Sequence, residues 1–341
     1  MPRFARPRRI LSGSLCVITL PVGAAACGSP ASGDAAGTTT GSGTANTFPV
    51  TVENCGTTMT FTKPPERVVL LKSSAVPYLA DIGVLDKVVS KAGQYPKDYY
   101  DPATLSALDA IPTLTDKLDP SGHLQISKEV VLAQEPDLVL GLTDTVNAQT
   151  LASSGIPLLE IPALCKGGPP DTPGFESVYS QLDMYGRIFG RQQQARQAIA
   201  SLNASVEQVT SRVPQRSGST GAVLYPTVGG GTTYAYGNLS MADPQLELAG
   251  FSNVFGDVDQ RVFEISAEQL LAKDPDVIVL LYSEGSPADV RAALTSLPGA
   301  DRLTAVKNGH VLVQLFNFTE PPSPLALTGL ENIEKTFVDV T

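Results

Sequence analysis

Residues 126–141, ISKEVVLAQEPDLVLG, recur as residues 265–280, ISAEQLLAKDPDVIVL, and this repeat decides the fold. Seven of the sixteen positions are identical without a gap. Each copy predicts a serine N-cap, a short amphipathic helix, a Pro-Asp turn and a buried strand. One copy on each side of the chain's centre implies two similar lobes, and a cleft between lobes is the usual place for a ligand.

Further apolar runs extend the alternation of strands and helices. The expected strands and the terminal helix cover residues 68–71, 87–91, 156–161, 222–225, 277–281, 311–315 and 325–337. Strands that alternate with helices are typical of an α/β fold with a parallel sheet. We therefore expect two Rossmann-like lobes with central parallel-rich sheets.

The middle of the chain predicts a connecting helix. After a break rich in Pro and Gly at 164–174, apolar side chains at helical spacing continue to Pro214, interrupted by Gly190. One helix of that length would span ~55–60 Å, enough to bridge two lobes. The expected division is an N-terminal lobe at 47–170, an inter-lobe helix at 171–214 and a C-terminal lobe at 215–341.

The N-terminal residues predict an export signal and a tether. Four arginines precede a mostly apolar stretch from Ile10 to Val22, which is too short to cross a bilayer as a helix. Ala24-Ala25-Ala26-Cys27 then resembles a bacterial lipobox, which implies cleavage of residues 1–26 and acylation of Cys27; an ordinary cleavage site is the alternative. Residues 27–46 are mainly Gly, Ser, Thr and Ala, the composition of a flexible tether.

Export would place the two remaining cysteines, Cys55 and Cys165, in an oxidising compartment as a single pair. We therefore predict a disulfide between them. Two buried free thiols are the alternative.

Composition excludes several classes of function. The 341 residues include 24 Lys+Arg and 34 Asp+Glu, a net charge of −10, which becomes −14 (−10 − 4) once four N-terminal arginines are cleaved off. An acidic chain is a poor partner for nucleic acid. Two histidines are too few for a His-rich metal site, so a preformed chelate is favoured over a bare metal ion. Neither a Gly-x-Ser-x-Gly nor a His-Glu-x-x-His motif occurs, so we expect neither catalysis nor a cofactor.

Three motifs carry a family resemblance. They are Pro65-Glu66-Arg67-Val68-Val69, Glu135-Pro136-Asp137-Leu138-Val139 and the block 246–257, LELAGFSNVFGD. On these motifs, residues 64–337 resemble the iron-siderophore, haem and cobalamin class of solute-binding proteins that serve ABC importers. The resemblance implies two α/β lobes joined by one rigid helix, a ligand held at the lobe edges, and a monomer that delivers it to a permease and its ATPase. It also implies a lipid-anchored position outside a bacterial cell membrane.

The resemblance further implies one acidic side chain on each lobe that docks onto the permease. Asp144 and Glu284 follow nearly equivalent strands of the two repeats and are the candidates. The alternative is a pair of solvated loop carboxylates, the usual state of acidic residues.

Side chains that follow the expected strands are candidate ligand contacts, because ligands of doubly wound lobes bind at the carboxyl ends of strands. Tyr234 and Tyr236 are added because the Gly229-Gly230-Gly231 loop before them allows close backbone approach. The candidates are Lys72, Ser73, Ser74, Tyr95, Thr143, Tyr225, Tyr234, Tyr236, Tyr282, Asn317 and Phe318. Aromatic rings offer flat apolar faces to a large chelate, and Lys72 offers a charge to an anionic one. The resemblance places the loop of His123 near the cleft; an exposed loop histidine is the alternative.

We expect a ferric-siderophore-type chelate as the small-molecule cargo. Haem and cobalamin are the alternatives within the resemblance. A free metal ion or a hydrolase substrate lies outside it.

Overall fold

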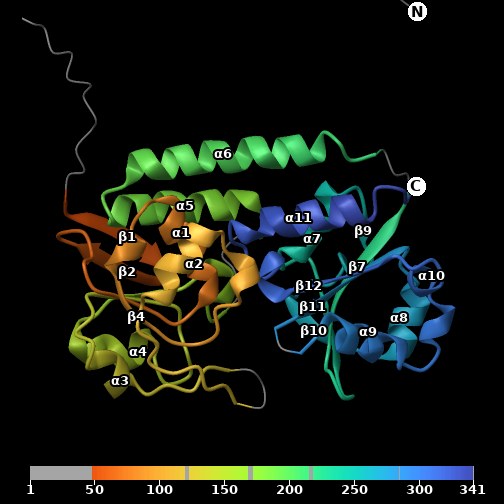
Figure 1. Ribbon diagram of the computed structural model, residues 1–341, viewed down its shortest axis with the longest axis horizontal. Helices are drawn as coiled ribbons and strands as arrows, with labels where there is room; N and C mark the ends of the chain where they lie inside the picture. The colour runs from red at the N-terminus through yellow and green to blue at the C-terminus, as the bar shows by residue number, and fades with distance from the viewer. Residues whose placement is uncertain (1–47, 120–122, 168–171, 215–217, 284, 341) are drawn as a thin grey trace, which may run out of the picture. The chain divides into compact units, whose positions relative to one another are not determined.

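The computed structural model describes residues 48–119, 123–167, 172–214, 218–283 and 285–340. Residues from Asn46 to Thr341 belong to one compact unit (Figure 1). The predicted signal peptide, Cys27 and tether lie outside the described residues, and so does Glu284. No helix in the described ranges is long and apolar enough to cross a membrane. The division into 47–170, 171–214 and 215–341 stays a prediction.

The N-terminal sheet is parallel throughout, in the order β4-β3-β5-β6. Its strands are β3 (Val68–Leu70), β4 (Val88–Lys91), β5 (Leu138–Leu140) and β6 (Leu158–Leu159). Its helices are α1 (Val76–Asp81), α2 (Pro102–Asp109), α3 (Lys128–Leu132) and α4 (Ala148–Leu151). A separate antiparallel hairpin of β1 (Val50–Asn54) and β2 (Thr57–Phe61) precedes the sheet.

The C-terminal sheet is mixed, in the order β10-β8-β7-β11-β12, with β9 also paired to β7. Its strands are β7 (Thr220–Pro226), β8 (Thr233–Tyr236), β9 (Ser252–Asn253), β10 (Val262–Ile265), β11 (Val277–Tyr282) and β12 (Val311–Leu315). Its helices are α7 (Ala242–Leu248), α8 (Ala267–Lys273), α9 (Pro287–Thr295), α10 (Thr304–Lys307) and α11 (Leu325–Thr336). The predicted α/β class with parallel-rich sheets is confirmed; β8 and β10 add two antiparallel pairings.

The two copies of the repeat have the same local structure. Ser127 and Ser266 are the N-caps of α3 and α8. Glu135 and Asp274, at equivalent positions after these helices, have positive φ angles of 50° and 39°. The aspartate of each Pro-Asp turn accepts hydrogen bonds from residues at the start of the neighbouring strand. Asp137 accepts the backbone N–H groups of Glu66 and Arg67, each at 2.8 Å, just before β3. Asp276 accepts the N–H and the hydroxyl of Thr220, at 2.8 and 2.9 Å, where β7 begins.

We expect replacement of Asp137 or Asp276 by alanine to lower the free energy of unfolding by about 2 kcal/mol each, because a charged acceptor of two hydrogen bonds is lost. Urea unfolding of both variants measures this. Asp301→Ala, at an exposed position, is the matched control and should change stability little. Equal stability of all three variants would contradict the assigned role.

The connection between the sheets differs from the expected single helix. It consists of α5 (Phe175–Ile188) and α6 (Gln192–Thr210), which pack side by side (Figure 1). The chain turns back at Gly190, whose φ is 68°, a conformation that glycine adopts readily. A Cβ on Gly186 would lie 2.5 Å from the Cβ of Ala195, so this glycine allows the close approach of the two helices. Helical periodicity alone could not show the reversal, because both helices keep an apolar face.

One hydrophobic cluster joins the two sheets through these helices. It contains Val68 and Tyr78 from the N-terminal half, Tyr185 and Leu202 from α5 and α6, and Leu330 from α11, among other buried residues. The hydrophobic core is therefore continuous between the two halves.

The predicted disulfide is confirmed. Cys55 and Cys165 are bonded, with their Cα atoms 5.1 Å apart and 110 positions apart in the sequence. The bond attaches the turn of the β1–β2 hairpin to the segment that follows β6.

Candidate ligand-binding site

Hydrogen bonds join the carboxyl ends of the two sheets. β3 is followed by the 3-10 turn η1 (Ser73–Ala75), β4 by η3 (Lys97–Tyr99) and β12 by η7 (Phe316–Phe318). Asn317 donates from Nδ2 to Ser73 Oγ at 3.3 Å and from its backbone N–H to the Tyr99 hydroxyl at 2.9 Å. The Tyr99 hydroxyl in turn donates to Asn317 Oδ1 at 3.3 Å. The predicted contacts Ser73 and Asn317 therefore meet, although they lie 244 positions apart in the sequence.

An aromatic cluster surrounds these bonds. The ring of Tyr99 packs edge-on against Phe318 at a centroid distance of 5.2 Å and against Tyr100 at 5.9 Å. Leu315, Leu325 and Tyr282 pack against the same group. Burial raises the pKa of Tyr99 and of Tyr100, so both hydroxyls remain protonated. Tyr99 and Tyr100 were not among the predicted contacts, although they follow β4 within ten residues.

Partly exposed rings extend this cluster. Tyr225 and Tyr234 lie directly opposite each other on β7 and β8, and Phe316 packs edge-on against Tyr225 at 5.9 Å. We define the aromatic edge as Tyr225, Tyr234, Tyr282, Phe316 and Phe318, which are all half-buried. Such a surface can pack against a large apolar or macrocyclic ligand while its tyrosine hydroxyls donate hydrogen bonds.

Four other predicted contacts are turned into the protein. The Tyr95 hydroxyl donates to the backbone carbonyls of Leu70 and Ala92, at 3.3 and 3.2 Å. Thr143 Oγ1 accepts the N–H of Val146 at 3.0 Å within its own loop. Ser74 and Tyr236 are 2% and 3% exposed. Placement after a strand does not distinguish such inward side chains from outward ones.

The side chain of Lys72 packs against the loop that follows β5. Its side chain lies directly over Gly141, where a Cβ would overlap Lys72 Cγ. The next residue, Leu142, donates its N–H at 2.9 Å to the carboxylate of Glu160, which is 1% exposed. Burial raises the pKa of the Glu160 carboxyl, and the charge of Lys72 opposes this increase. Lys72 itself is half-buried, and the expectation that it offers its charge to an anionic ligand stays a prediction.

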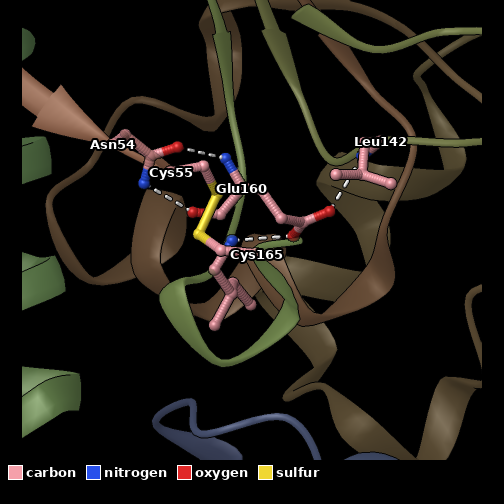
Figure 2. The surroundings of a disulfide bond; sticks show 6 residues. Asn54, Cys55, Leu142, Glu160 and Cys165 are labelled. Atoms are coloured by element: carbon pink, nitrogen blue, oxygen red, sulfur yellow. Dashed lines mark hydrogen bonds between the residues drawn. A yellow bond between two sulfur atoms is a disulfide. The ribbon is translucent and has the colours of Figure 1, made fainter. Parts of the chain in front are cut away.

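Figure 2 shows how the position of Glu160 is fixed. The side chain of Asn54 donates to the Glu160 carbonyl and accepts the Glu160 N–H, both at 2.8 Å. Glu160 Oε1 also accepts the N–H of Ile161 at 2.7 Å. Because Asn54 precedes the disulfide-bonded Cys55, the backbone of Glu160 is held next to the disulfide. In the sequence, the lone glutamate inside the apolar run 156–161 was the indication of this buried carboxylate.

A second buried carboxylate, also missed, belongs to Glu320. It lies two residues after η7, is 0% exposed, and accepts Arg261 Nη1 and the Met241 N–H at 2.6 Å each. Burial raises the pKa of this carboxyl, and the charge of Arg261 opposes the increase. Glu320 thus holds the segment that carries Phe316 and Phe318 against the C-terminal half.

The remaining candidates lie on the surface or outside the described residues. His123 is an exposed loop histidine; its side chain is 70% exposed and its ring lies 3.5 Å from Asp119. Asp144 is exposed in the loop after β5. Glu284 and Cys27 are not among the described residues.

Two cavities are lined by residues outside the aromatic edge. One of about 710 Å³ lies in the N-terminal half beside Lys91, Tyr95 and Asp109. The other, of about 570 Å³, lies between β1 and α5. The described residues contain no group of three or more His, Cys, Asp or Glu side chains that could hold a metal ion.

Comparisons with known proteins agree with this architecture. Residues 68–314 match the family model described as "Periplasmic binding protein". The crystal structure of an ABC-type Fe3+-hydroxamate transport system from Saccharomonospora viridis is 54% identical, with a TM-score of 0.81, over 85% of this chain and 99% of that chain. A cobalamin-binding protein of Halobacterium salinarum is 26% identical over 86% of this chain and 75% of its own length. The Bacillus subtilis ABC transporter substrate-binding lipoprotein YvrC, described as uncharacterized, is 23% identical over 85% of each chain.

Two parallel-rich sheets whose carboxyl ends meet at an aromatic edge define a solute-binding protein with two lobes. The chain belongs to the periplasmic binding protein family. Membership implies a position outside the cytoplasm, a small-molecule ligand and an ABC permease as partner.

Proposed function

We propose that this protein captures a ferric hydroxamate chelate at the aromatic edge and delivers it to an ABC import permease. The observation that carries this is the 54% identity, over 85% of the chain, to a protein described as an Fe3+-hydroxamate transport component. The site is compatible with such a cargo, because a chelate brings its own iron ligands and needs only shape, apolar contact and hydrogen-bond donors.

The anchor and the docking residues are part of the proposal. The likeness to a lipoprotein of Bacillus subtilis supports acylation of Cys27 after removal of residues 1–26, with 27–46 as the tether. The exposed position of Asp144 is compatible with docking to the permease, and Glu284 would serve the second lobe. The protein would act as a monomer.

Titration of the purified protein with ferric trihydroxamates, haemin and cobalamin tests the cargo. Because the chain has ten tyrosines and no tryptophan, binding is followed by quenching of tyrosine fluorescence. We expect saturable quenching by a ferric trihydroxamate with at least ~100-fold tighter binding than by haemin or cobalamin, a difference of about 2.7 kcal/mol. The iron-free trihydroxamate is the control. Tighter binding of cobalamin or haemin would replace the proposed cargo.

A further inference from the structure

The Tyr99 hydroxyl, in the N-terminal half, makes two hydrogen bonds to Asn317 of the C-terminal half. It accepts the Asn317 backbone N–H at 2.9 Å and donates to Oδ1 of the same residue at 3.3 Å. Both residues are buried, with 7% and 8% of their surface exposed. The ring of Tyr99 packs edge-on against Phe318 at 5.2 Å, and this contact restricts the position of the hydroxyl.

These bonds determine which way the side-chain amide of Asn317 faces. A phenolic hydroxyl carries one proton, and the Asn317 backbone N–H already uses the oxygen as its acceptor. In the part of the chain that the structure describes, Oδ1 of Asn317 is the acceptor for that proton. If the amide were reversed, the proton of a buried hydroxyl would lose its acceptor, which is costly. Nδ2 is therefore directed to the other side, where it donates to Ser73 Oγ at 3.3 Å.

The amide oriented in this way has a hydrogen-bond donor to spare. Nδ2 carries two N–H groups, and only the bond to Ser73 is formed within the described ranges. Asn317 lies in η7 between Phe316 and Phe318, two rings of the aromatic edge. The hydroxamate groups of a ferric chelate present oxygen atoms, which accept hydrogen bonds and do not donate them. A donor between two rings complements such a ligand.

Resting on the proposed function, we infer that Tyr99 is a positioning residue for ligand binding: its hydroxyl orients the Asn317 amide so that Nδ2 donates a hydrogen bond to an oxygen of the ferric hydroxamate. Tyr99 acts through Asn317 and not by contact with the ligand. Because Tyr99 follows β4 and Asn317 follows β12, the affinity for the ligand depends on a contact between the two halves.

The test measures binding of a ferric trihydroxamate to the wild type, Tyr99→Phe and Tyr100→Phe by quenching of tyrosine fluorescence. Tyr99→Phe keeps the ring but releases the amide, so we expect at least ~10-fold weaker binding, mainly through faster dissociation. Tyr100→Phe is the matched control. Tyr100 belongs to the same cluster, but its hydroxyl donates to the Ser73 backbone carbonyl at 3.1 Å and not to Asn317. Its replacement should change the affinity about 2-fold or less.

A double-mutant cycle separates positioning from a merely structural role. Asn317→Ala should weaken binding at least ~10-fold, and Tyr99→Phe added to it should cause no further loss, because Tyr99 acts through this amide. A structural role of Tyr99 would give additive losses. Asn317→Asp keeps the acceptor for the Tyr99 hydroxyl and removes the donor, so it should also bind at least ~10-fold more weakly. This variant decides the donor role if Tyr99→Phe does not fold.

Several outcomes would overturn the inference and leave the proposed function intact. They are wild-type affinity in folded Tyr99→Phe, equal losses in Tyr99→Phe and Tyr100→Phe, additive losses in the double variant, and wild-type affinity in Asn317→Asp. If the wild type itself does not bind the ferric trihydroxamate, the proposed function fails, and the inference fails with it.

Discussion

Replacement of both Cys55 and Cys165 by serine is expected to lower the free energy of unfolding by about 4–5 kcal/mol. The disulfide joins positions that are 110 residues apart, so its loss releases a long loop in the unfolded chain. In the chain-entropy account a loop of that size contributes about this amount. The measurement is urea unfolding of the wild-type and double-serine proteins, followed by circular dichroism.

A reducing agent supplies the matched control for this prediction. It should lower the unfolding midpoint of the wild type towards that of the serine variant and leave the variant itself unchanged. The hydrogen bonds between Asn54 and Glu160 remain in both proteins, so the difference reports the covalent link. A serine variant as stable as the wild type would show that the unfolded chain is already compact around this link.

Gly329→Ala is expected to destabilise the protein by about 3 kcal/mol or more, although alanine normally favours a helix over glycine by about 1 kcal/mol. Gly329 lies in α11, and a Cβ there would overlap the backbone carbonyl oxygen of Phe318. It would also lie 2.6 Å from Nε2 of Gln245, which donates to the same carbonyl at 2.7 Å. Because the obstacle is backbone, η7 must move.

Movement of η7 should also impair ligand binding. Phe318 and Asn317 are neighbours in η7, and Asn317 makes the hydrogen bonds to Ser73 and Tyr99. We expect Gly329→Ala to weaken binding of the ferric trihydroxamate at least ~10-fold, in addition to its effect on stability. Chemical unfolding and fluorescence titration of the same preparation measure the two effects.

Gly174→Ala is the control for this substitution. Gly174 is the N-cap of α5 with a φ of 178°, and a Cβ at this residue would have no neighbour within 4 Å, so alanine should fit without strain. If Gly329→Ala has the same free energy of unfolding as the wild type, α11 and η7 can separate without loss of stability. This would contradict the packing described above.

Part of the site could be predicted from strand ends alone. The carboxyl-end rule selected Ser73, Tyr225, Tyr282, Asn317 and Phe318, and the glycine loop at 229–231 selected Tyr234; these residues lie in or beside the aromatic edge. The rule also selected Tyr95, and the glycine loop Tyr236, which are both turned inward. Both signals fix where a residue lies along the chain and not which way its side chain points.

The charges could not be assigned from the sequence. Glu160 lies 88 positions after Lys72, and only the parallel packing of β3, β5 and β6 brings the two segments together. Arg261 and Glu320 are likewise 59 positions apart. Long-range pairs of this kind leave no periodic pattern in a sequence.

The sequence by itself determined the α/β class and the duplicated unit of helix, Pro-Asp turn and strand, because these follow from local caps, turns and hydrophobic periodicity. It also identified the single pair of cysteines available after export. The tertiary structure decided that the connection folds back at Gly190, that Asn317 meets Ser73 and Tyr99, and that Arg261 is paired with the buried carboxylate of Glu320. These features depend on contacts between distant segments, which form only when the apolar faces are buried together.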